Sequence, residues 1–163
     1  MNNKKTTWSY YTPSWLSDFI VRYVKKKIKS DNINVLEPSC WDWVFVNSIN
    51  RYDISKKINK FTLSDINEDA LRKASSFSWS YKIEKYLWDF LKLELKKEYD
   101  LIIWNPPYIH KKYLSDEQKE SCLEWYKRAE IHNKKVLNIW PSFIYKSTFL
   151  LKDDGILVFV IPE

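Results

Sequence analysis

Glycine is almost missing from this sequence. The chain has one glycine, Gly155, in 163 residues, whereas about eleven are expected at an average frequency of about 7%. Tryptophan, normally one of the rarest residues, occurs nine times. Folded domains need glycine at turns where φ is positive, and tryptophan is a poor substitute because its Cβ clashes there. Our hypothesis is that a triplet read as glycine in the source organism, as a reassigned TGA would be, has been translated as tryptophan.

Long apolar runs, cysteine and histidine are also scarce. No apolar stretch approaches the length needed to cross a bilayer, and the first residues do not form a signal peptide, so we expect a cytoplasmic protein with no membrane insertion. Cys40 and Cys122 lack the spacing of a disulfide framework or a metal site, and we interpret Cys40 as a small buried residue. His110 and His132 have no ligand partners at a useful spacing. We therefore expect no metal and treat both histidines as surface or packing residues.

The charge balance is basic. The formal net charge is +6 and the sequence pI is about 9.1, which favours a polyanionic partner because lysine and arginine contacts to phosphate supply most non-specific affinity for nucleic acid. An equally good interpretation is that runs such as Lys25-Lys26-Lys27 form solvated helix faces. Charge alone does not decide between the two.

Segments with helical spacing alternate with short apolar runs. The pattern predicts helices over residues 16–29, 44–49 and 138–151, another helix opening at residue 67, and strands over residues 34–36, 61–63, 99–103 and 156–161. This alternation predicts one α/β domain over residues 1–163, with a Rossmann-like, doubly wound, mostly parallel sheet that ends near the fifth strand. The charged residues 110–135 are expected to form a long surface loop, and residues 153–155 a turn.

The tetrapeptide Asn105-Pro106-Pro107-Tyr108 carries the strongest chemical signal. It follows a predicted strand, and the residues after a parallel strand lie on the functional edge of a sheet. Two prolines hold the backbone extended and lack N–H donors, so the Asn105 side-chain oxygen and the Pro106 carbonyl can both accept hydrogen bonds from one NH2 group. This would free the amine lone pair for attack on an electrophilic methyl group, while Tyr108 could stack on an extruded base. The alternative is a rigid turn capped by a core tyrosine.

Three further segments precede this tetrapeptide in the sequence. They are Tyr10-Tyr11-Thr12-Pro13, the loop from Leu36 to Phe45, and Asp89-Phe90. Together the four segments resemble the motifs of the amino-methyltransferases that act on adenine in DNA, notably those of restriction-modification systems. The resemblance extends over nearly the whole chain. It implies the class I methyltransferase fold, S-adenosylmethionine as cofactor, and the N6 nitrogen of adenine in DNA as methyl acceptor.

The resemblance also implies roles for individual residues. Asp65 ends a predicted strand, a placement suited to a carboxylate that accepts hydrogen bonds from ribose hydroxyls, and Asp89 with Phe90 would contact the adenine of the cofactor. Taken singly, Asp65 and Asp89 are explained equally well as turn and helix-start residues. The implied catalytic residues are Asn105, Pro106, Pro107 and Tyr108, and the implied cofactor-binding residues are Tyr11, Thr12, Glu37, Pro38, Asp42, Asp65, Ile66, Asp89 and Phe90.

Several tryptophans stand where this family has glycine. These are Trp41, Trp43 and Trp104, with Trp8 and Trp88 as further candidates, whereas an aromatic residue is natural at position 140. The distribution favours a misread glycine triplet over random drift. Because glycine lets the backbone of a cofactor loop approach its ligand, indoles at 41 and 43 are expected to weaken cofactor binding.

Two other functions fit the same residues. A protein-glutamine or RNA-adenine methyltransferase would offer the tetrapeptide a similar NH2 group, and a non-catalytic remnant could bind DNA through its basic surface. The resemblance favours DNA as the partner. Because the chain stops just after the expected fifth strand, we interpret it as a catalytic domain without its target-recognition region. A downstream segment, or a recognition or restriction subunit, would supply that region.

Overall fold

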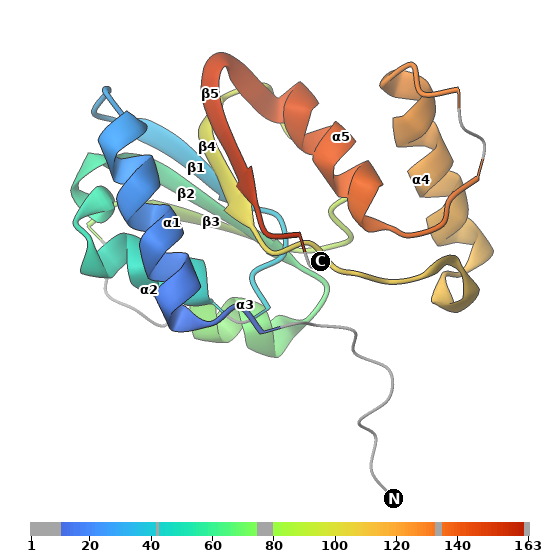
Figure 1. Cartoon of the computed structure of the whole chain (residues 1–163), viewed down its shortest axis with the longest axis horizontal. Coiled ribbons are helices and arrows are strands. Elements are labelled where there is room, and N and C mark those ends of the chain that lie inside the picture. Colours follow the sequence, from blue (N-terminus) through green and yellow to red (C-terminus); the bar gives the residue numbers. More distant parts are fainter. Residues whose placement is uncertain (1–10, 42, 75–79, 133–134, 162–163) are drawn as a thin grey trace, which may run out of the picture.

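The protein is built on one parallel β-sheet (Figure 1). The computed structural model describes residues 11–41, 43–74, 80–132 and 135–161. Its five strands lie in the order β3-β2-β1-β4-β5, and every neighbouring pair is parallel. The strands are β1 (Ile33–Glu37), β2 (Ile58–Asp65), β3 (Lys82–Leu87), β4 (Tyr99–Trp104) and β5 (Leu151–Phe159).

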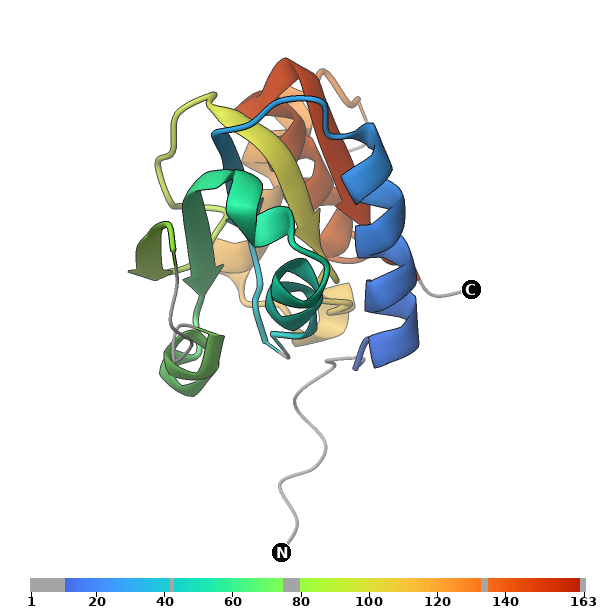
Figure 2. The same cartoon turned by 90° about the vertical axis from the view of Figure 1, so that its left-hand side faces the viewer.

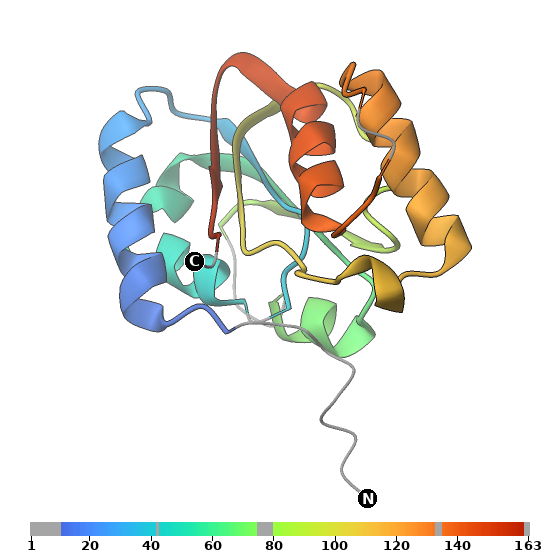
Figure 3. The same ribbon diagram turned by 45° about the vertical axis from the view of Figure 1, so that its right-hand side comes forward.

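Helices cover both faces of the sheet, as Figures 2 and 3 show from two directions. One face carries α1 (Ser14–Lys27), α2 (Val44–Arg51) and α3 (Glu68–Ala74), and the other carries α4 (Asp116–Arg128) and α5 (Trp140–Leu150). Short 3-10 turns follow α2 at Ile54–Lys57 and β4 at Lys111–Tyr113. Among the described residues, no helix has the length and apolar character of a membrane span. The predicted doubly wound α/β fold is confirmed, and the sheet is wholly parallel within the described chain.

Two apolar cores form because successive strand residues point to opposite faces. Val35, Leu101 and Ile103 pack with buried residues of α1, α2 and α3, while Leu36 and Ile102 pack with residues of α4 and α5. Cys40 lies in the first core and is fully buried, as predicted, and both cysteines are free thiols. Strands buried on both faces account for their near-continuous apolar sequences.

Two of the predicted segments are wrong. Residues 110–135 are not one long loop, because α4 lies within them. Its N-terminus is fixed by a capping box. The Ser115 hydroxyl accepts a hydrogen bond from the backbone N–H of Gln118, and the Gln118 side-chain oxygen accepts one from the backbone N–H of Ser115. Residues 153–155 do not form a turn before the last strand, because β5 begins at Leu151 and continues through them with a register shift against β4.

The remaining predicted elements are confirmed to within a few residues, and one strand was not predicted. β3 lies at the edge of the sheet beside β2. Its residues alternate between exposed and half-buried, and it carries Lys82, Glu84 and Lys85, so its sequence lacks the apolar run that marks a central strand.

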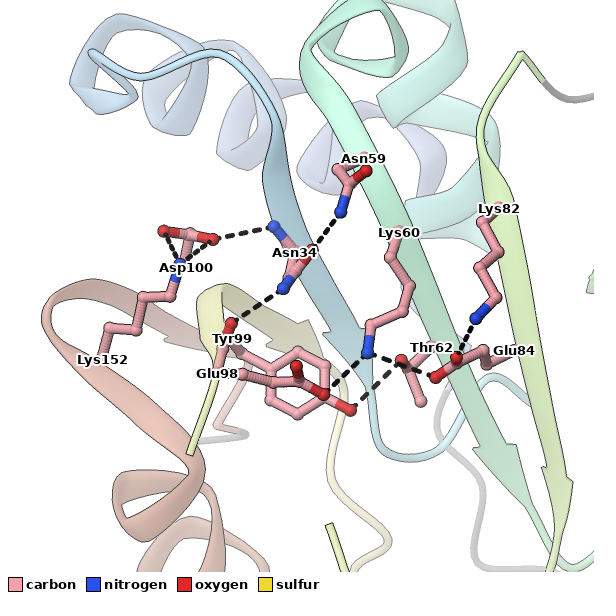
Figure 4. Close-up of polar contacts among 10 residues, drawn as sticks. All are labelled: Asn34, Asn59, Lys60, Thr62, Lys82, Glu84, Glu98, Tyr99, Asp100 and Lys152. Carbon is pink, nitrogen blue, oxygen red and sulfur yellow. Dashed lines mark hydrogen bonds and ion pairs between the residues drawn. The ribbon is translucent and has the colours of Figure 1, made fainter. Parts of the chain in front are cut away.

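Polar side chains connect the amino ends of the strands (Figure 4). Lys60 on β2 forms ion pairs with Glu98 at 2.7 Å and with Glu84 on β3 at 3.3 Å. The backbone N–H of Asn34 on β1 donates to Asp100 on β4, which also pairs with Lys152 on β5. These contacts connect neighbouring strands at their amino ends, opposite the carboxyl ends from which the loops after β1 to β4 leave the sheet.

We expect Lys60→Met to lower the free energy of unfolding at neutral pH by about 1.5–3 kcal/mol, the usual worth of hydrogen bonds to charged groups. The pKa of Glu84 is lowered by its hydrogen bond from Lys82 and then by that from Lys60. This contribution is therefore present above the ordinary carboxyl pKa and lost as the pH falls through the lower folded-state value. Urea unfolding should show the difference between wild type and variant shrinking from about pH 7 to about pH 3. A difference that is equal at both pH values would contradict the assignment.

Candidate active site

The loops that follow β1, β2, β3 and β4 meet at a cavity of about 80 Å³. It lies at the carboxyl edge of the sheet beside the boundary between β1 and β4, where the strand order reverses, which is the usual ligand position in open α/β sheets. Two larger cavities, of about 490 and 510 Å³, lie elsewhere. The small cavity matters because its walls contain predicted site residues: Pro38, Asp65, Ile66, Asp89, Phe90 and Pro107.

Asp65 ends β2 and is buried, with 7% of its surface exposed. Its Oδ1 atom accepts a hydrogen bond from the backbone N–H of Asn67 at 2.9 Å, whereas its buried Oδ2 atom has no hydrogen-bond partner among the described residues. Burial raises the pKa of this carboxyl group, and backbone hydrogen bonds from Asn67, Cys40 and Ile66 oppose that shift. An oxygen in this position is suited to accept a hydrogen bond from a ligand hydroxyl.

Asp89 and Phe90 form a tight turn after β3. Oδ1 of Asp89 accepts a hydrogen bond from the N–H of Leu91 at 3.0 Å, and its backbone oxygen accepts from Lys92 and Leu93. The Phe90 ring packs against Phe143 of α5, with centroids 5.1 Å apart. The turn therefore presents a carboxylate and an aromatic ring at the same cavity wall.

Asn105, directly after β4, contacts the N-terminal segment of the chain. Its Nδ2 atom donates a hydrogen bond to Oγ1 of Thr12 at 3.1 Å, and Thr12 is only 6% exposed. This contact joins the predicted segment around Thr12 to the tetrapeptide across the fold. It also fixes the orientation of the Asn105 amide.

Tyr108 completes the tetrapeptide and is held by the last strand. Its hydroxyl donates a hydrogen bond to the backbone oxygen of Val160, just beyond β5. The residue is 8% exposed, and burial raises the pKa of its hydroxyl to about 12. The tyrosine is therefore neutral at physiological pH, and its hydroxyl acts as a donor.

Not every predicted site residue reaches the cavity. Tyr11 is 75% exposed, and Glu37 is buried at the end of β1. Asp42 lies outside the described residues, as do Tyr10 and Trp8. Conversely, α4 and α5 supply cavity residues that the sequence did not suggest. A capping-box pattern was available for α4, but nothing in the sequence indicated which face would meet the site. The cavity residues that the sequence analysis did not assign to the site are Ser39, Trp88, Ile109, Gln118, Ile139 and Phe143.

No metal cluster of three or more His, Cys, Asp or Glu side chains occurs in the part of the chain that the structure describes. His110 and His132 are exposed. His110 accepts a hydrogen bond from the backbone of Lys112 through Nδ1, which makes it a local surface residue.

Trp43 has a backbone conformation that suits glycine. It lies at φ 47° and ψ 15° at the start of α2, in the left-handed region. A bulky residue held there costs about 1–3 kcal/mol. Gly155, in contrast, has no positive φ. Asn32, Asp53 and Glu130 also have positive φ among the described residues, but Trp43 is the bulkiest residue held there, while the single glycine does not use this freedom.

The tryptophans also differ in how their indole N–H groups are satisfied. Trp125 of α4 donates its N–H to the backbone oxygen of Leu91 at 2.8 Å. The N–H groups of Trp41 and Trp104 are buried and find no acceptor in the described parts of the chain. The whole Trp104 side chain is buried, and its ring packs against Phe159. Leaving a buried donor unsatisfied costs about 1–3 kcal/mol. Trp125 fits its site, and Trp41 and Trp104 do not.

These differences predict the codons of the gene. We expect TGA at positions 41, 43 and 104, because Trp43 has a left-handed backbone conformation and the buried N–H groups of Trp41 and Trp104 find no acceptor among the described residues. We expect TGG at position 125, because the indole of Trp125 donates a hydrogen bond to Leu91. Sequencing the genomic DNA of the source organism would check this. TGG at all four positions would contradict the misreading hypothesis.

The fold is that of the class I S-adenosylmethionine-dependent methyltransferases. Such an enzyme from Listeria monocytogenes superposes with a TM-score of 0.71 at 20% identity, over 98% of this chain and 48% of its own. The methyltransferase subunit of a type I restriction-modification system from Streptococcus thermophilus gives a TM-score of 0.63 at 13% identity, over 92% of this chain and 34% of its own.

The sequence defines the family more narrowly. The model of the Eco57I restriction-modification methylases matches residues 14–163, and the chain belongs to this family. Type II methyltransferase M.HincII of Haemophilus influenzae is 27% identical over 157 residues, which cover 94% of this chain and 27% of the relative. Type II methyltransferase M.TthHB8I of Thermus thermophilus is 33% identical over 135 residues, covering 78% of this chain and 29% of the relative. The chain thus spans less than a third of the length of these curated relatives.

Proposed function

We propose that this chain is the catalytic core of a methyltransferase that transfers a methyl group from S-adenosylmethionine to N6 of adenine in DNA. The observation that carries the proposal is the joint position of Asn105–Tyr108 and the Asp65–Asp89 cavity at one edge of the sheet. The family match and the restriction-modification relatives support DNA as the substrate.

The residues around the cavity fit the cofactor chemically. The Oδ2 atom of Asp65 can accept hydrogen bonds from the ribose hydroxyls. The Asp89 carboxylate can accept a hydrogen bond from the amine of an adenine, and the Phe90 ring can pack against the face of that base. Glu37 at the end of β1 and Pro38 in the following loop would then contact the methionine part, together with Tyr11 and Thr12. The resemblance suggests the same role for Asp42, which lies outside the described residues. Ile66 adds apolar wall beside the ribose. Bound there, the cofactor supplies an electrophilic methyl group on sulfur.

Asn105 and Pro106 would prepare the methyl acceptor. Because the nitrogen of the Asn105 amide donates to Thr12, its oxygen is the atom suited to accept a hydrogen bond from the target NH2 group. The Pro106 carbonyl accepts the second hydrogen, and Pro107 keeps this segment free of N–H donors. Two accepted hydrogen bonds make the nitrogen more tetrahedral, so its lone pair can attack the methyl carbon. The bond from that carbon to sulfur would break as the new bond forms, its electron pair would stay on sulfur to leave S-adenosylhomocysteine, and the methylated amine would then lose one proton to solvent.

Tyr108 would stack on the target base once the base leaves the duplex. The hydrogen bond to Val160 fixes one end of the tyrosine ring, so the ring can act as a rigid platform. Stacking of this kind contributes about 1–3 kcal/mol per base.

A side-by-side methylation assay tests the proposal. Methyl-labelled cofactor would be offered with DNA, RNA and release-factor protein, and the DNA product hydrolysed to nucleosides. We expect label in N6-methyladenine from DNA. Label in protein glutamine or in RNA alone would favour the alternative methyltransferases, and binding to DNA without transfer would favour a non-catalytic remnant. We also propose that a further segment or subunit recognises the DNA sequence, because phosphate contacts from a basic surface carry no direct sequence information.

Two substitutions should separate catalysis from cofactor binding. Asn105→Ala should abolish methyl transfer and leave most cofactor affinity, because Asn105 faces the acceptor amine. Asp65→Ala should raise the cofactor dissociation constant by about tenfold to a hundredfold, the equivalent of about 1.5–3 kcal/mol. Calorimetry and single-turnover rates measure both effects. Asn59→Ala, at the opposite edge of the sheet, is the control, and wild-type turnover by Asn105→Ala would refute the mechanism.

The tryptophans bear on whether the cofactor can enter. The cavity of about 80 Å³ is below the roughly 300–1,000 Å³ typical of small-molecule sites. Trp88 lines it, whereas within the described residues Trp41, Trp43 and Trp104 do not. The expected crowding of the cofactor by indoles is therefore direct at position 88. At position 43 the effect is on the loop backbone instead.

We therefore expect the chain as written to bind S-adenosylhomocysteine weakly. The fourfold variant Trp41→Gly, Trp43→Gly, Trp88→Gly and Trp104→Gly should bind at least about tenfold more tightly, a gain of about 1.4 kcal/mol or more. Calorimetric titration of both proteins checks this. The control is Trp125→Gly, which should destabilise the fold without improving affinity. Tight binding by the tryptophan form would contradict the expectation.

A further inference from the structure

A lysine is buried behind the turn that forms one wall of the candidate cofactor site. Lys146 of α5 is 2% exposed. Its Nζ atom donates hydrogen bonds to the backbone oxygens of Phe90 and Leu93. The same ammonium lies 4.8 Å from the centroid of the Phe90 ring and 5.1 Å from that of the Trp125 ring. Among the described residues Lys146 forms no ion pair, and such a buried lysine needs a reason, because burying a charge is costly unless hydrogen bonds satisfy it.

The contacts of Lys146 concentrate on one short segment. The turn from Asp89 to Leu93 is closed internally by the hydrogen bonds of Asp89. From outside, Trp125 donates to the backbone oxygen of Leu91, and Lys146 donates to those of Phe90 and Leu93. Side chains of α4 and α5 thus hold the backbone of a turn that is distant from them in the sequence.

The front of this turn faces the cavity where Asp89 and Phe90 lie. Its back faces a second cavity of about 490 Å³, lined by residues that include Lys146, Arg128 and Glu124. Phe90 and Leu91 are buried in the apolar core with residues of α4 and α5, and the Phe90 ring packs against Phe143. The hydrogen bonds from Trp125 and Lys146 add to this packing by fixing the backbone of the turn.

We propose that Lys146 is a positioning residue that holds the Asp89–Phe90 turn in place and thereby sets the affinity of the site for its cofactor. The proposal rests on the proposed function for the identity of the ligand. The placement of the turn itself depends only on contacts within the protein.

The charge of Lys146 is part of this role. Burial lowers the pKa of Lys146 to about 8. The charged groups that act on it are Asp89 in the turn, Arg128 and Glu124 on α4, and Glu94 after the turn; the acidic groups favour its charge, and Arg128 opposes it. Raising the pH through this value removes the positive charge, which weakens the hydrogen bonds to the two carbonyl oxygens and the attraction to the rings.

Hydrogen exchange tests the positioning role without any cofactor. In the full chain at neutral pH, Lys146→Met should lower the protection factors of the amides at 91–93 by about tenfold. In the wild type, the same protection factors should fall between about pH 7 and pH 9, and the variant should lack this step. Lys60→Met is the matched control, because it removes a half-buried lysine at the opposite edge of the sheet and should leave the turn protected. Unchanged protection in Lys146→Met, or a flat wild-type profile, would overturn the proposal.

Titration with S-adenosylhomocysteine tests the connection to the site. Lys146→Met should raise the dissociation constant by about tenfold, and Lys60→Met should not. Both are measured in the chain as written and in the fourfold variant Trp41→Gly, Trp43→Gly, Trp88→Gly and Trp104→Gly. Loss of protection with an unchanged dissociation constant would overturn the link between the turn and the cofactor. If neither background bound the ligand at all, the proposed function would fail instead, and the exchange data would still decide whether Lys146 holds the turn.

Discussion

The parallel arrangement of the five strands is the constraint on which the rest of this structure depends. Parallel strands place all their carboxyl ends at one edge, so Asp65, Asp89 and Pro107 line one cavity although long stretches of sequence separate them. The reversal of strand order between β1 and β4 separates the following loops at that edge and leaves room for a ligand. At the other edge, Lys60, Asp100 and their partners tie the strands with ion pairs and hydrogen bonds. Stability and function therefore occupy opposite ends of the same sheet.

The sequence predicts those parts of the site that depend on position along a strand. A carboxylate or an Asn-Pro-Pro-Tyr segment at the end of an apolar run must lie at the carboxyl edge of a parallel sheet, and Asp65 and Asn105 do so. Contacts between distant segments have no such local signal. The Thr12–Asn105 hydrogen bond and the Lys146 contacts depend on how helices pack, which periodicity does not specify. Helix α4 was not predicted, because its many charged residues were interpreted as a loop although the segment has a buried face and a capping-box pattern.

The tryptophans fall into two groups that composition alone could not separate. Trp125 behaves as a core residue. Its N–H donates a hydrogen bond to Leu91, and the cationic groups of Arg128 and Lys146 lie over its ring. Trp43 is held in a left-handed backbone conformation, and Trp104 has a buried N–H without an acceptor in the described chain. Trp43 precedes α2 after the loop that follows β1, and Trp104 ends β4 directly before Asn105. Both indoles pack against the apolar cores, so a misread glycine at either position would affect stability as well as the candidate site.

We propose that the cofactor binds at the carboxyl edge of the sheet, in the cavity lined by Asp65 and Asp89, and not in one of the larger cavities. The most direct test is an NMR titration of the ¹⁵N-labelled chain with S-adenosylhomocysteine, because chemical-shift mapping reports weak binding as well as tight binding. The account predicts shifts at the amides of residues 65–67 and 88–91, next to the cavity that Asp65 and Asp89 line. Shifts confined to Ile33, Asp100 and Asp154, which line the cavity of about 510 Å³ at the opposite edge, would contradict it.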